Sequence, residues 1–545
     1  MKNSLIALTL LLCSANLYAE KYLSEIKPLP HEKWYGAYTA KAYCNTPLKD
    51  LSFQPYEMNE KKKDLQTDNR GNQAVPLLVS NKGRYVWSNE PFAFELKEGT
   101  LMIYTDYEKV EAIASGNTLR EAYVAAKDKH FPASGKTPNA LMFKTPQYNT
   151  WIELGNDQTQ AAIKKYADDV LANDFPTGVF MIDDNWSNYR GNFDFNLATF
   201  PDAKGLIEYL HSKNFRIMLW VTPFVSPDSK EYKELLQLDA LVLKKDSKEP
   251  AIIKWWNGYS ACLDFTKPAA IDWMRKKLKN LQENFGVDGF KFDAADFDFY
   301  IKGSPNYPNE ATNTPGPIQA EMFGKLGAEF DFNEFRAGWK NGNQPLAQRL
   351  QDKQYSWDDL KLLVPDMLSA GIIGHPFTCP DMIGGGLRSN FENIDYSKFD
   401  QQLMIRSAQV QALMPMMQFS VAPWRVLDTM HFRICREVAW LHAKMGGYIY
   451  QLAQQAAKDG EPIVRHMEYA FPNEGFESSD DQFMLGKYLV APMVDKGFAR
   501  TVKLPKGNWI DELEKKYKGG QNITIDVPLN RLPYFELQHV KSKMK

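Results

Sequence analysis

The stretch Val287–Asp293 reads VDGFKFD, a short apolar run that ends in an acidic residue. An amphipathic helix is predicted directly before it, over Ile271–Phe285. A second apolar run, Arg216–Val221 (RIMLWV), follows a helical pattern over residues 202–214 in the same way. Buried strands that alternate with amphipathic helices are typical of parallel sheets, because a crossover helix joins each strand to the next. The stretch therefore predicts an α/β fold.

The same alternation extends from residue 141 to residue 445. The run 178–182 ends at Asp183-Asp184, and a helix predicted over 357–370 leads to Ile372-Ile373-Gly374. We expect this segment to close as a (β/α)8 TIM barrel, whose active face lies at the C-terminal ends of its strands. The alternative, an open doubly wound sheet, would predict a glycine-rich phosphate loop after an early strand, and the sequence has none.

Short apolar stretches separated by turn residues flank the predicted barrel on both sides. Residues 20–140 and residues 446–545 each have this pattern, which predicts an N-terminal and a C-terminal β-sandwich domain. The runs concerned are 84–87, 92–96, 100–104, 482–494, 501–504 and 523–527. A helix predicted over 115–129 leads from the first domain toward the barrel.

Residues 1–19 are typical of a signal peptide. Lys2 gives a positive start, Leu5–Leu12 is apolar, and Leu17-Tyr18-Ala19 is a cleavage pattern. The apolar run is shorter than the roughly 20 residues that a bilayer span needs, and no later segment is predicted to cross a membrane. We expect cleavage after Ala19 and export to the periplasm or the medium. A lipid anchor on Cys13 is the alternative, which the large Leu12 before it disfavours.

The composition excludes several classes of function. Lys and Arg number 65 against 67 Asp and Glu, a net charge of -2 without a basic run, so we expect no nucleic-acid partner. The cysteines are widely spaced, which disfavours zinc, and we expect neither a metal nor a cofactor. Cys262 and Cys379 lie near the predicted active face, where a disulfide and two free buried thiols are both open. The sequence does not indicate the oligomeric state.

Acidic residues end several of the predicted strands. Hydrolysis of a glycosidic bond needs two carboxyl groups, one at the anomeric carbon and one to protonate the departing oxygen. Asp293 closes an apolar run, and Lys291 lies two residues back on the same side of the strand, where its charge keeps a carboxylate ionised. A helix cap or a buried Lys-Asp pair is the structural alternative.

Other polar and aromatic residues near strand ends are suited to sugars. Asp183, Asp184, Asn185 and Trp186 combine carboxylates, an amide and an indole, and Trp255 and Trp256 lie in a second such segment, 254–258. Either set of tryptophans could belong to the core instead. Asp381 lies in a glycine-supported turn, whereas Asp352 by itself could be a helix cap.

Together these motifs resemble glycoside hydrolase family 31, and within it the α-galactosidase-like branch. The resemblance runs from about Thr150 to Leu537 and rests on the order and spacing of six segments. They are 182–184 (IDD), 219–225 (LWVTPFV), 255–258 (WWNG), 290–294 (FKFDA), 380–385 (PDMIGG) and 414–425 (MPMMQFSVAPWR). The resemblance implies a barrel flanked by β-sandwich domains and the exo-acting, retaining hydrolysis of an α-linked oligosaccharide or glycoside.

The resemblance also implies roles for single residues. It puts the nucleophile at Asp293 and the general acid/base at Asp352, five residues before a tryptophan that opens a helix. It implies that the remaining candidates touch the sugar or the nucleophile: Asp184, Asp381, Lys291, Arg349, Trp220, Trp255 and Trp256.

Two departures from the family pattern bear on the substrate. Many α-glucosidases of the family have a histidine shortly after the Gln-Phe-Ser segment, where this chain has Pro423; the α-galactosidase-like branch also lacks it, which favours galactose. Ala295-Asp296 replaces a frequent Gly-Glu pair, which leaves another α-glycoside, such as a glucoside or xyloside, open. A non-catalytic sugar-binding protein is disfavoured because both catalytic positions are occupied.

Overall fold

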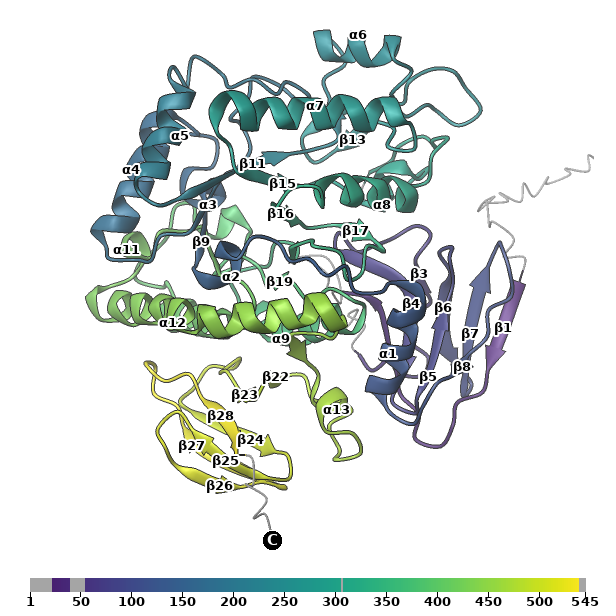
Figure 1. Ribbon diagram of the computed structural model, residues 1–545, viewed down its shortest axis with the longest axis vertical. Coiled ribbons are helices and arrows are strands. Elements are labelled where there is room, and N and C mark those ends of the chain that lie inside the picture. Colours follow the sequence, from purple (N-terminus) through teal and green to yellow (C-terminus); the bar gives the residue numbers. More distant parts are fainter. Residues whose placement is uncertain (1–21, 40–53, 305–306, 539–545) are drawn as a thin grey trace, which may run out of the picture.

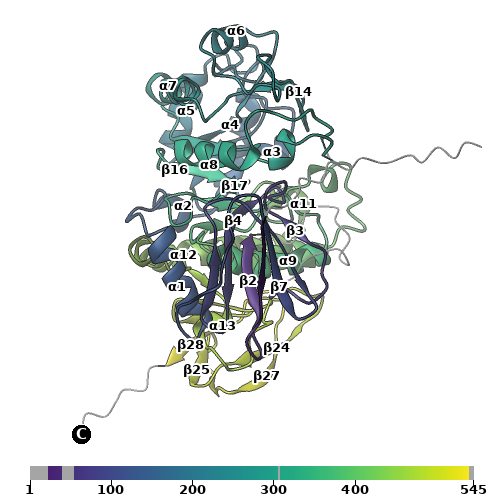
Figure 2. The ribbon, with the colours of Figure 1, turned by 90° about the vertical axis from the view of Figure 1, so that its right-hand side faces the viewer.

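A computed structural model describes residues 22–39, 54–304 and 307–538 of the protein. The barrel lies in the upper part of Figure 1, with the N-terminal β-sheet domain at its lower right and the C-terminal β-sheet domain at its lower left. The predicted signal peptide lies outside the described residues. Figure 2 shows α6 (Lys230–Gln237) at one end of the molecule and the C-terminal strands at the other. In the part of the chain that is described, no helix has the length and apolar character needed to cross a membrane.

Eight parallel strands form the barrel. Their order in the sheet is β19 (Thr378–Cys379), β18 (Gln348–Arg349), β16 (Phe332–Phe335), β15 (Gly289–Phe292), β11 (Arg216–Val221), β10 (Val179–Ile182), β9 (Gln147–Asn149) and β20 (Gln418–Phe419). A bridge between Met382 and Gln418 joins the segment after β19 to β20, so the barrel is nearly closed. The predicted α/β class and the TIM barrel are confirmed.

Helices cover the outside of the barrel between these strands. They include α4 (Gln160–Ala172), α5 (Ala203–Ser212), α7 (Pro268–Phe285), α8 (Gly316–Gly327), α9 (Trp357–Ile372), α10 (Gln401–Ala412) and α12 (Thr429–Asp459). Local chemistry sets their ends. The Asp202 carboxylate caps α5 by accepting a hydrogen bond from the Gly205 N–H, and α7 ends at Gly286, which has a left-handed φ of 80°.

The N-terminal domain contains two sheets, and one of them continues into the barrel domain. The first has the order β1 (Tyr22–Ile26), β7 (Thr100–Thr105), β6 (Ala93–Lys97) and β3 (Lys63–Asp64). The second combines β2 (Trp34–Tyr38), β4 (Gln73–Ser80), β5 (Arg84–Trp87) and β8 (Ile113–Ala114) with β17 (Gly338–Trp339). Because β17 follows β16 in the chain and pairs with β4, the two domains share a sheet. A helix, α1 (Leu119–His130), leads to the barrel.

The C-terminal domain has a six-stranded and a two-stranded sheet. The larger has the order β21 (Val464–Arg465), β22 (Phe483–Leu485), β23 (Tyr488–Val490), β28 (Tyr534–Gln538), β25 (Asn508–Asp511) and β26 (Lys516–Lys518). The smaller pairs β24 (Ala499–Leu504) with β27 (Gln521–Asp526). These strands include the runs that the sequence marks after residue 482.

Two local expectations differ from the structure. The border at residue 445 falls inside α12, because Gly446 continues the helix and lets it approach α2 (Leu141–Lys144) closely; a Cβ there would lie 2.4 Å from the Lys144 carbonyl oxygen. The apolar pair Ile372-Ile373 is not a strand. Ile372 ends α9, and both isoleucines pack against the N-terminal domain, so their burial has another cause than strand pairing.

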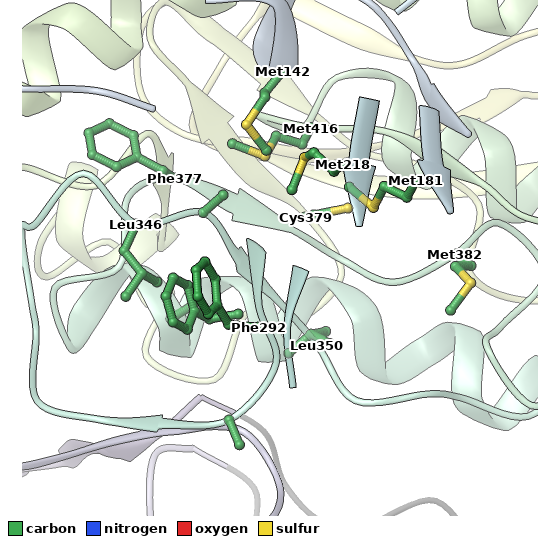
Figure 3. Close-up of a cluster of buried hydrophobic side chains, with 14 of the residues drawn as sticks. Met142, Met181, Met218, Phe292, Leu346, Leu350, Phe377, Cys379, Met382 and Met416 are labelled. Carbon is green, nitrogen blue, oxygen red and sulfur yellow. The ribbon is translucent and has the colours of Figure 1, made fainter. Parts of the chain in front are cut away.

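Buried methionine, phenylalanine, leucine and cysteine side chains in and around the barrel strands form one cluster, which Figure 3 shows. Its labelled members include Met181, Met218, Phe292 and Cys379. Cys262 belongs to a separate cluster around Trp220 and contacts the Tyr300 hydroxyl at 3.3 Å. Both cysteines are free, so the two buried thiols, and not the disulfide, are observed.

Candidate active site

A cavity of about 720 Å³ opens at the C-terminal ends of the barrel strands. All of the predicted site residues except Trp186, Trp255 and Asp381 line it. The lining comprises Trp151, Asn156, Asp183, Asp184, Asn185, Trp220, Trp256, Asn257, Lys291, Asp293, Asp296, Tyr307, Arg336, Arg349, Gln351, Asp352, Met382 and Leu387. A single cavity of this size and polarity at this face of a TIM barrel is the expected place for an active site.

Asp293 follows β15 directly, and protein donors hold both of its carboxylate oxygens. Oδ1 accepts hydrogen bonds from Arg336 Nε at 2.9 Å and from the Ala294 N–H at 2.8 Å, and Oδ2 accepts one from Trp220 Nε1 at 3.0 Å. Burial by itself raises the pKa of this carboxyl, but the charges of Arg336 and Lys291 outweigh it and hold the pKa of Asp293 well below its usual range. Asp293 is therefore ionised at neutral pH.

The backbone after two of the cavity acids lies in the left-handed region. Ala294 follows Asp293 with φ of 68°, and Asn185 follows Asp184 with φ of 73°. In each case the amide N–H of the second residue is turned onto the preceding carboxylate. Such a conformation costs a residue with a Cβ about 1–3 kcal/mol and persists only where the surroundings enforce it. The strained backbone at Ala294 and Asn185 thus directs one N–H donor onto Asp293 and one onto Asp184.

Lys291 extends from β15 to Asp183, the acid that follows β10, with β11 lying between the two strands in the sheet. Its Nζ lies 2.7 Å from Asp183 Oδ2, and both side chains are buried. Burial lowers the pKa of Lys291, but the charge of Asp183 outweighs it, so that the pKa is raised. The buried Lys-Asp pair that the sequence left open exists, but with Asp183 as the partner. The ammonium still lowers the pKa of Asp293.

Arg349 at the end of β18 contacts three acids from three different segments. Its Nη1 donates to Asp352 Oδ1 and to Asp381 Oδ1, both at 2.9 Å, and its Nε donates to Glu334 Oε1 at 3.1 Å. Burial lowers the pKa of the guanidinium, but the three carboxylates outweigh it and raise the pKa. Arg349 also lowers the pKa of Asp293, so one cation acts on both predicted catalytic acids.

Asp352 and Asp381 differ in their access to the cavity. The side chain of Asp352 is 30% exposed and lines the cavity, whereas that of Asp381 is buried and does not line the cavity. Asp381 accepts hydrogen bonds from the Lys353 and Gly386 N–H groups as well as from Arg349. Burial raises the pKa of Asp381 to about 7. These hydrogen bonds orient Arg349 and the backbone at Lys353 and Gly386, and the Asp381 side chain does not reach the cavity.

Trp186 and Trp255 are buried core residues, and neither of them lines the cavity. Trp186 donates from Nε1 to the Trp220 carbonyl oxygen at 2.8 Å. Trp255 stacks on Phe224 with ring centroids 4.3 Å apart. Both indoles bury their apolar faces and satisfy their N–H inside the protein, which is the usual state of tryptophan in a core. The core alternative left open by the sequence therefore applies to both.

Trp256, unlike Trp255, lies at the cavity because it belongs to the turn of a hairpin that covers the active face. β13 (Ile253–Trp255) and β14 (Gly258–Cys262) pair so that Trp256 and Asn257 form a two-residue turn. Trp256 is 45% exposed at the cavity, and Asn257 Nδ2 donates to Asp184 Oδ2 at 2.9 Å.

Asp184 is held in addition by both terminal nitrogens of Arg190. Burial raises the pKa of Asp184, and the charge of Arg190 opposes this. Asp184 thus joins the end of β10 to the loop of Arg190 and to the hairpin turn.

Several residues of the site were not predicted, above all Arg336. Its guanidinium contacts Asp293 with Nε and both carboxylate oxygens of Asp296 with its terminal nitrogens. It follows β16, whose sequence FNEF contains two buried polar side chains, Asn333 and Glu334. Because a buried asparagine and glutamate interrupt the apolar run, the strand is hard to recognise. A strand prediction that tolerated them would have marked Arg336 as another polar residue at a strand end.

Two models for parts of one protein family match this chain. The "Glycosyl hydrolases family 31 TIM-barrel domain" matches residues 141–452, and the "Glycosyl hydrolase family 31 C-terminal domain" matches residues 460–537. The mouse myogenesis-regulating glycosidase is 30% identical over 400 residues, which cover 72% of this chain and 55% of that protein. The alpha-glucosidase 2 of Bacillus thermoamyloliquefaciens is 25% identical, with 69% and 50% covered. The chain thus spans about half the length of these curated relatives.

Solved structures share the fold at lower sequence identity. A Flavobacterium johnsoniae GH31 dextranase complexed with glucose superimposes with a TM-score of 0.82 at 20% identity, covering 94% of this chain and 66% of the other. A GH31 alpha-xylosidase from a soil metagenome, complexed with xylose, gives a TM-score of 0.79 at 19% identity, with 95% and 79% covered. With its barrel and its C-terminal domain both matched by the family models, the chain belongs to glycoside hydrolase family 31.

Proposed function

We propose that this protein is an exo-acting, retaining α-glycoside hydrolase in which Asp293 is the nucleophile and Asp352 the general acid/base. One observation carries the proposal: two carboxyl groups in unlike environments line one cavity. Asp293 is buried among cations that keep it ionised, as a nucleophile requires. Asp352 is partly exposed and has one short contact, to Arg349. Two carboxyl groups with such different environments suit the two roles of a retaining glycosidase.

The reaction proceeds in two displacements. In the first, protonated Asp352 gives its proton to the glycosidic oxygen, a carboxylate oxygen of Asp293 attacks the anomeric carbon, and the bond to the leaving group breaks. In the second, ionised Asp352 takes a proton from water, whose oxygen attacks the same carbon and displaces Asp293. Two inversions release the sugar with retained configuration. No step uses a metal or a cofactor.

The remaining cavity residues would bind and orient the sugar. Asp183, Asp184 and Asn257 would offer carboxylate and amide groups to hydroxyls, and the indoles of Trp256 and Trp220 line the same cavity. Because Lys291 and Arg349 are paired with acids inside the protein, their main effect would be to fix those acids and to stabilise the ionised nucleophile. This arrangement supports recognition of a neutral sugar.

An α-galactoside is the substrate that we favour. Pro423, the first residue of α11 (Pro423–Val426), replaces the histidine of many family α-glucosidases, as in the α-galactosidase-like branch. The names of other relatives favour a second candidate, an α-glucoside or α-xyloside, because they include an alpha-glucosidase, a dextranase and an alpha-xylosidase.

A panel of 4-nitrophenyl α-glycosides separates these candidates. The panel contains α-galactoside, α-glucoside and α-xyloside, with β-galactoside as the control. We expect the highest kcat/KM for α-galactoside and no cleavage of the β-anomer, and NMR should show the α-anomer of the sugar as the first product. Faster cleavage of α-glucoside would refute galactose but not the mechanism. A folded protein that cleaves none of them would refute the enzymatic function itself.

Export of the protein is a separate proposal, which rests on residues 1–19 alone. Expression of the full chain in a Gram-negative host tests it. Mass spectrometry of the product should show Glu20 as the first residue, and full-length chain in the cytoplasm would contradict it.

A further inference from the structure

A segment of the N-terminal domain, residues 69–72, reaches the active face of the barrel. It connects β3 to β4 and contacts the loops that follow β15, β16 and β18. Those loops carry or adjoin Asp293 and Asp352. Asn69 and Asn72 are almost completely buried, although asparagine is usually exposed. Buried amides must be hydrogen-bonded, so their partners show what the segment does.

Asn69 holds the loop that follows Asp293. Its Nδ2 donates to the Ala295 carbonyl oxygen at 3.1 Å, and its Oδ1 accepts from the Phe297 N–H at 3.5 Å. Ala295 lies one residue after the strained Ala294, whose N–H is directed onto the Asp293 carboxylate. The Asn69 side chain therefore helps to enforce the backbone conformation that orients this donor.

Gly71 holds the cation that contacts Asp293. Its carbonyl oxygen accepts a hydrogen bond from Arg336 Nη1 at 2.6 Å. Asp296 binds the same guanidinium on the other side, and the Nε of Arg336 is left to contact Asp293. The rotation of the guanidinium is thus fixed by two groups, one of which belongs to the N-terminal domain.

Asn72 holds the loop of Asp352. Its Oδ1 accepts from the Gln351 N–H at 2.8 Å, one residue before the acid, and its Nδ2 donates to the Arg70 carbonyl oxygen at 2.7 Å. The Asn72 carbonyl oxygen accepts from the Gly338 N–H at 3.1 Å, which ties the segment to β17. The strand pairing between β17 and β4 therefore anchors the segment.

We propose that residues 69–72 position both catalytic carboxyl groups, with Asn69 and Gly71 acting on the side of Asp293 and Asn72 acting on the side of Asp352. The proposal rests on the function proposed above. Its physical basis is that displacement of a reacting group by about 1 Å can lower a rate by on the order of a hundredfold. Asn69 and Asn72 do not line the cavity, so they are positioning residues and not catalytic ones.

Two variants, Asn69→Ala and Asn72→Ala, test the two halves of the proposal. The control is Asn117→Ala, which removes the same group from the surface of the same domain. Each protein is assayed for kcat/KM with the best glycone of the panel, attached either to 2,4-dinitrophenol or to an unactivated sugar alcohol. The first leaving group departs without a proton from the enzyme, whereas the second needs one.

The two variants should differ in their dependence on the leaving group. Asn72→Ala should lower kcat/KM by about tenfold or more for the unactivated substrate and by less than about threefold for the dinitrophenyl substrate. Asn69→Ala should lower both by a similar factor, about tenfold, because attack by Asp293 is needed with either leaving group. Asn117→Ala should equal the wild type. A general loss of structure would not produce a leaving-group dependence in one variant alone.

Folded Ala variants with wild-type kcat/KM on both substrates, or with the same loss on both substrates for Asn72→Ala, would overturn the proposal. If either Ala variant does not fold by circular dichroism, the near-isosteric Asn69→Asp and Asn72→Asp replace them. Asn72→Asp keeps the acceptor for Gln351 and should retain the wild-type leaving-group dependence, whereas Asn69→Asp loses the donor to Ala295 and should not retain wild-type rates. A wild type inactive on the whole panel refutes the proposed function instead, before any variant is compared.

Discussion

The two sides of the cavity hold their acids in opposite ways. On the β15 side, Asp293 accepts three hydrogen bonds from Trp220, Arg336 and its own following backbone, in a buried and strained setting. On the β18 side, Asp352 has one short contact, from Arg349, and keeps part of its side chain exposed. Asp293 is thus immobilised and ionised, whereas Asp352 is less constrained and accessible from the cavity.

This difference indicates how the chain could separate two chemically identical groups. Burial raises the pKa of a carboxyl, and only nearby cations reverse that effect. For Asp293 the cations are supplied by neighbouring strands of the barrel, Lys291 on β15 itself and Arg336 after β16. The division of roles therefore depends on what surrounds each aspartate, and substitutions on either side should have distinct effects.

Asp293→Asn should have the largest effect. An amide cannot attack the anomeric carbon, so the rate of hydrolysis should fall by about 10⁴-fold or more on every substrate. The measurement is kcat/KM together with circular dichroism to establish folding. Asp288→Asn, at the opposite end of the same strand, removes a carboxylate that contacts His211 and the start of β11, and should keep wild-type activity per folded molecule. An active Asp293→Asn protein would falsify the nucleophile assignment.

Asp352→Asn should lower activity in a way that depends on the leaving group. For unactivated glycosides the loss of proton donation should lower kcat/KM by about 10²–10⁴-fold, whereas a dinitrophenyl glycoside should be cleaved at nearly the wild-type kcat/KM. Added azide, which attacks the glycosyl-enzyme without a general base, should raise kcat with the dinitrophenyl substrate. An equal loss on both substrates, without an effect of azide, would mean that Asp352 is not the acid/base.

Arg336→Met should reduce the difference between the environments of Asp293 and Asp352. Removing the cation raises the pKa of Asp293, because burial then acts with less opposition, so the acidic limb of the pH profile of kcat/KM should move to higher pH. We also expect kcat to fall by about a hundredfold, since the carboxylate loses an orienting donor. Arg275→Met, which loses a surface ion pair with Glu329, is the matched control. An unchanged acidic limb would show that Arg336 does not set the ionisation of Asp293.

Glu468→Gln tests the same electrostatic rule where it should have the smallest effect. This buried carboxyl in α13 (Met467–Ala470) accepts a hydrogen bond from the Asn473 N–H, and its Oε2 has no hydrogen-bond partner among the described residues. Burial raises its pKa from 4.5 to about 7. The folded state therefore binds the proton more tightly than the unfolded state, so its contribution to stability is complete below pH 4.5 and is lost as the pH rises to about 7.

The glutamine amide that this substitution introduces would remain neutral at all pH values. We expect the melting temperature of Glu468→Gln to equal that of the wild type at pH 4.5 and to exceed it by about 2 °C at pH 8. A scanning calorimetry series across this range measures it, with the exposed Glu514→Gln as the control. A variant that is less stable than the wild type at pH 8 would contradict the rule that burial without a cation disfavours the ionised carboxyl.

Local patterns in the sequence were sufficient for much of the fold. The strand Arg216–Val221 has the predicted bounds, and the helices before β15 and β19 start or end within three residues of their predicted limits, since apolar periodicity and caps are encoded locally. The rule that polar residues end buried strands marked Asp183, Asp184 and Asp293, which line the cavity.

What the sequence by itself determined is the barrel, the strand ends and the acids that stand on them, because these follow from short-range patterns of apolar and polar residues. Only the tertiary structure decided which neighbours those acids meet. In the folded chain Trp186 and Trp255 are buried in the core, and Asp381 is buried outside the lining of the cavity. Arg336 contacts Asp293 and is in turn bound by the segment 69–72. The physical reason is that burial and charge pairing depend on contacts between residues far apart in the chain, and no local pattern encodes them.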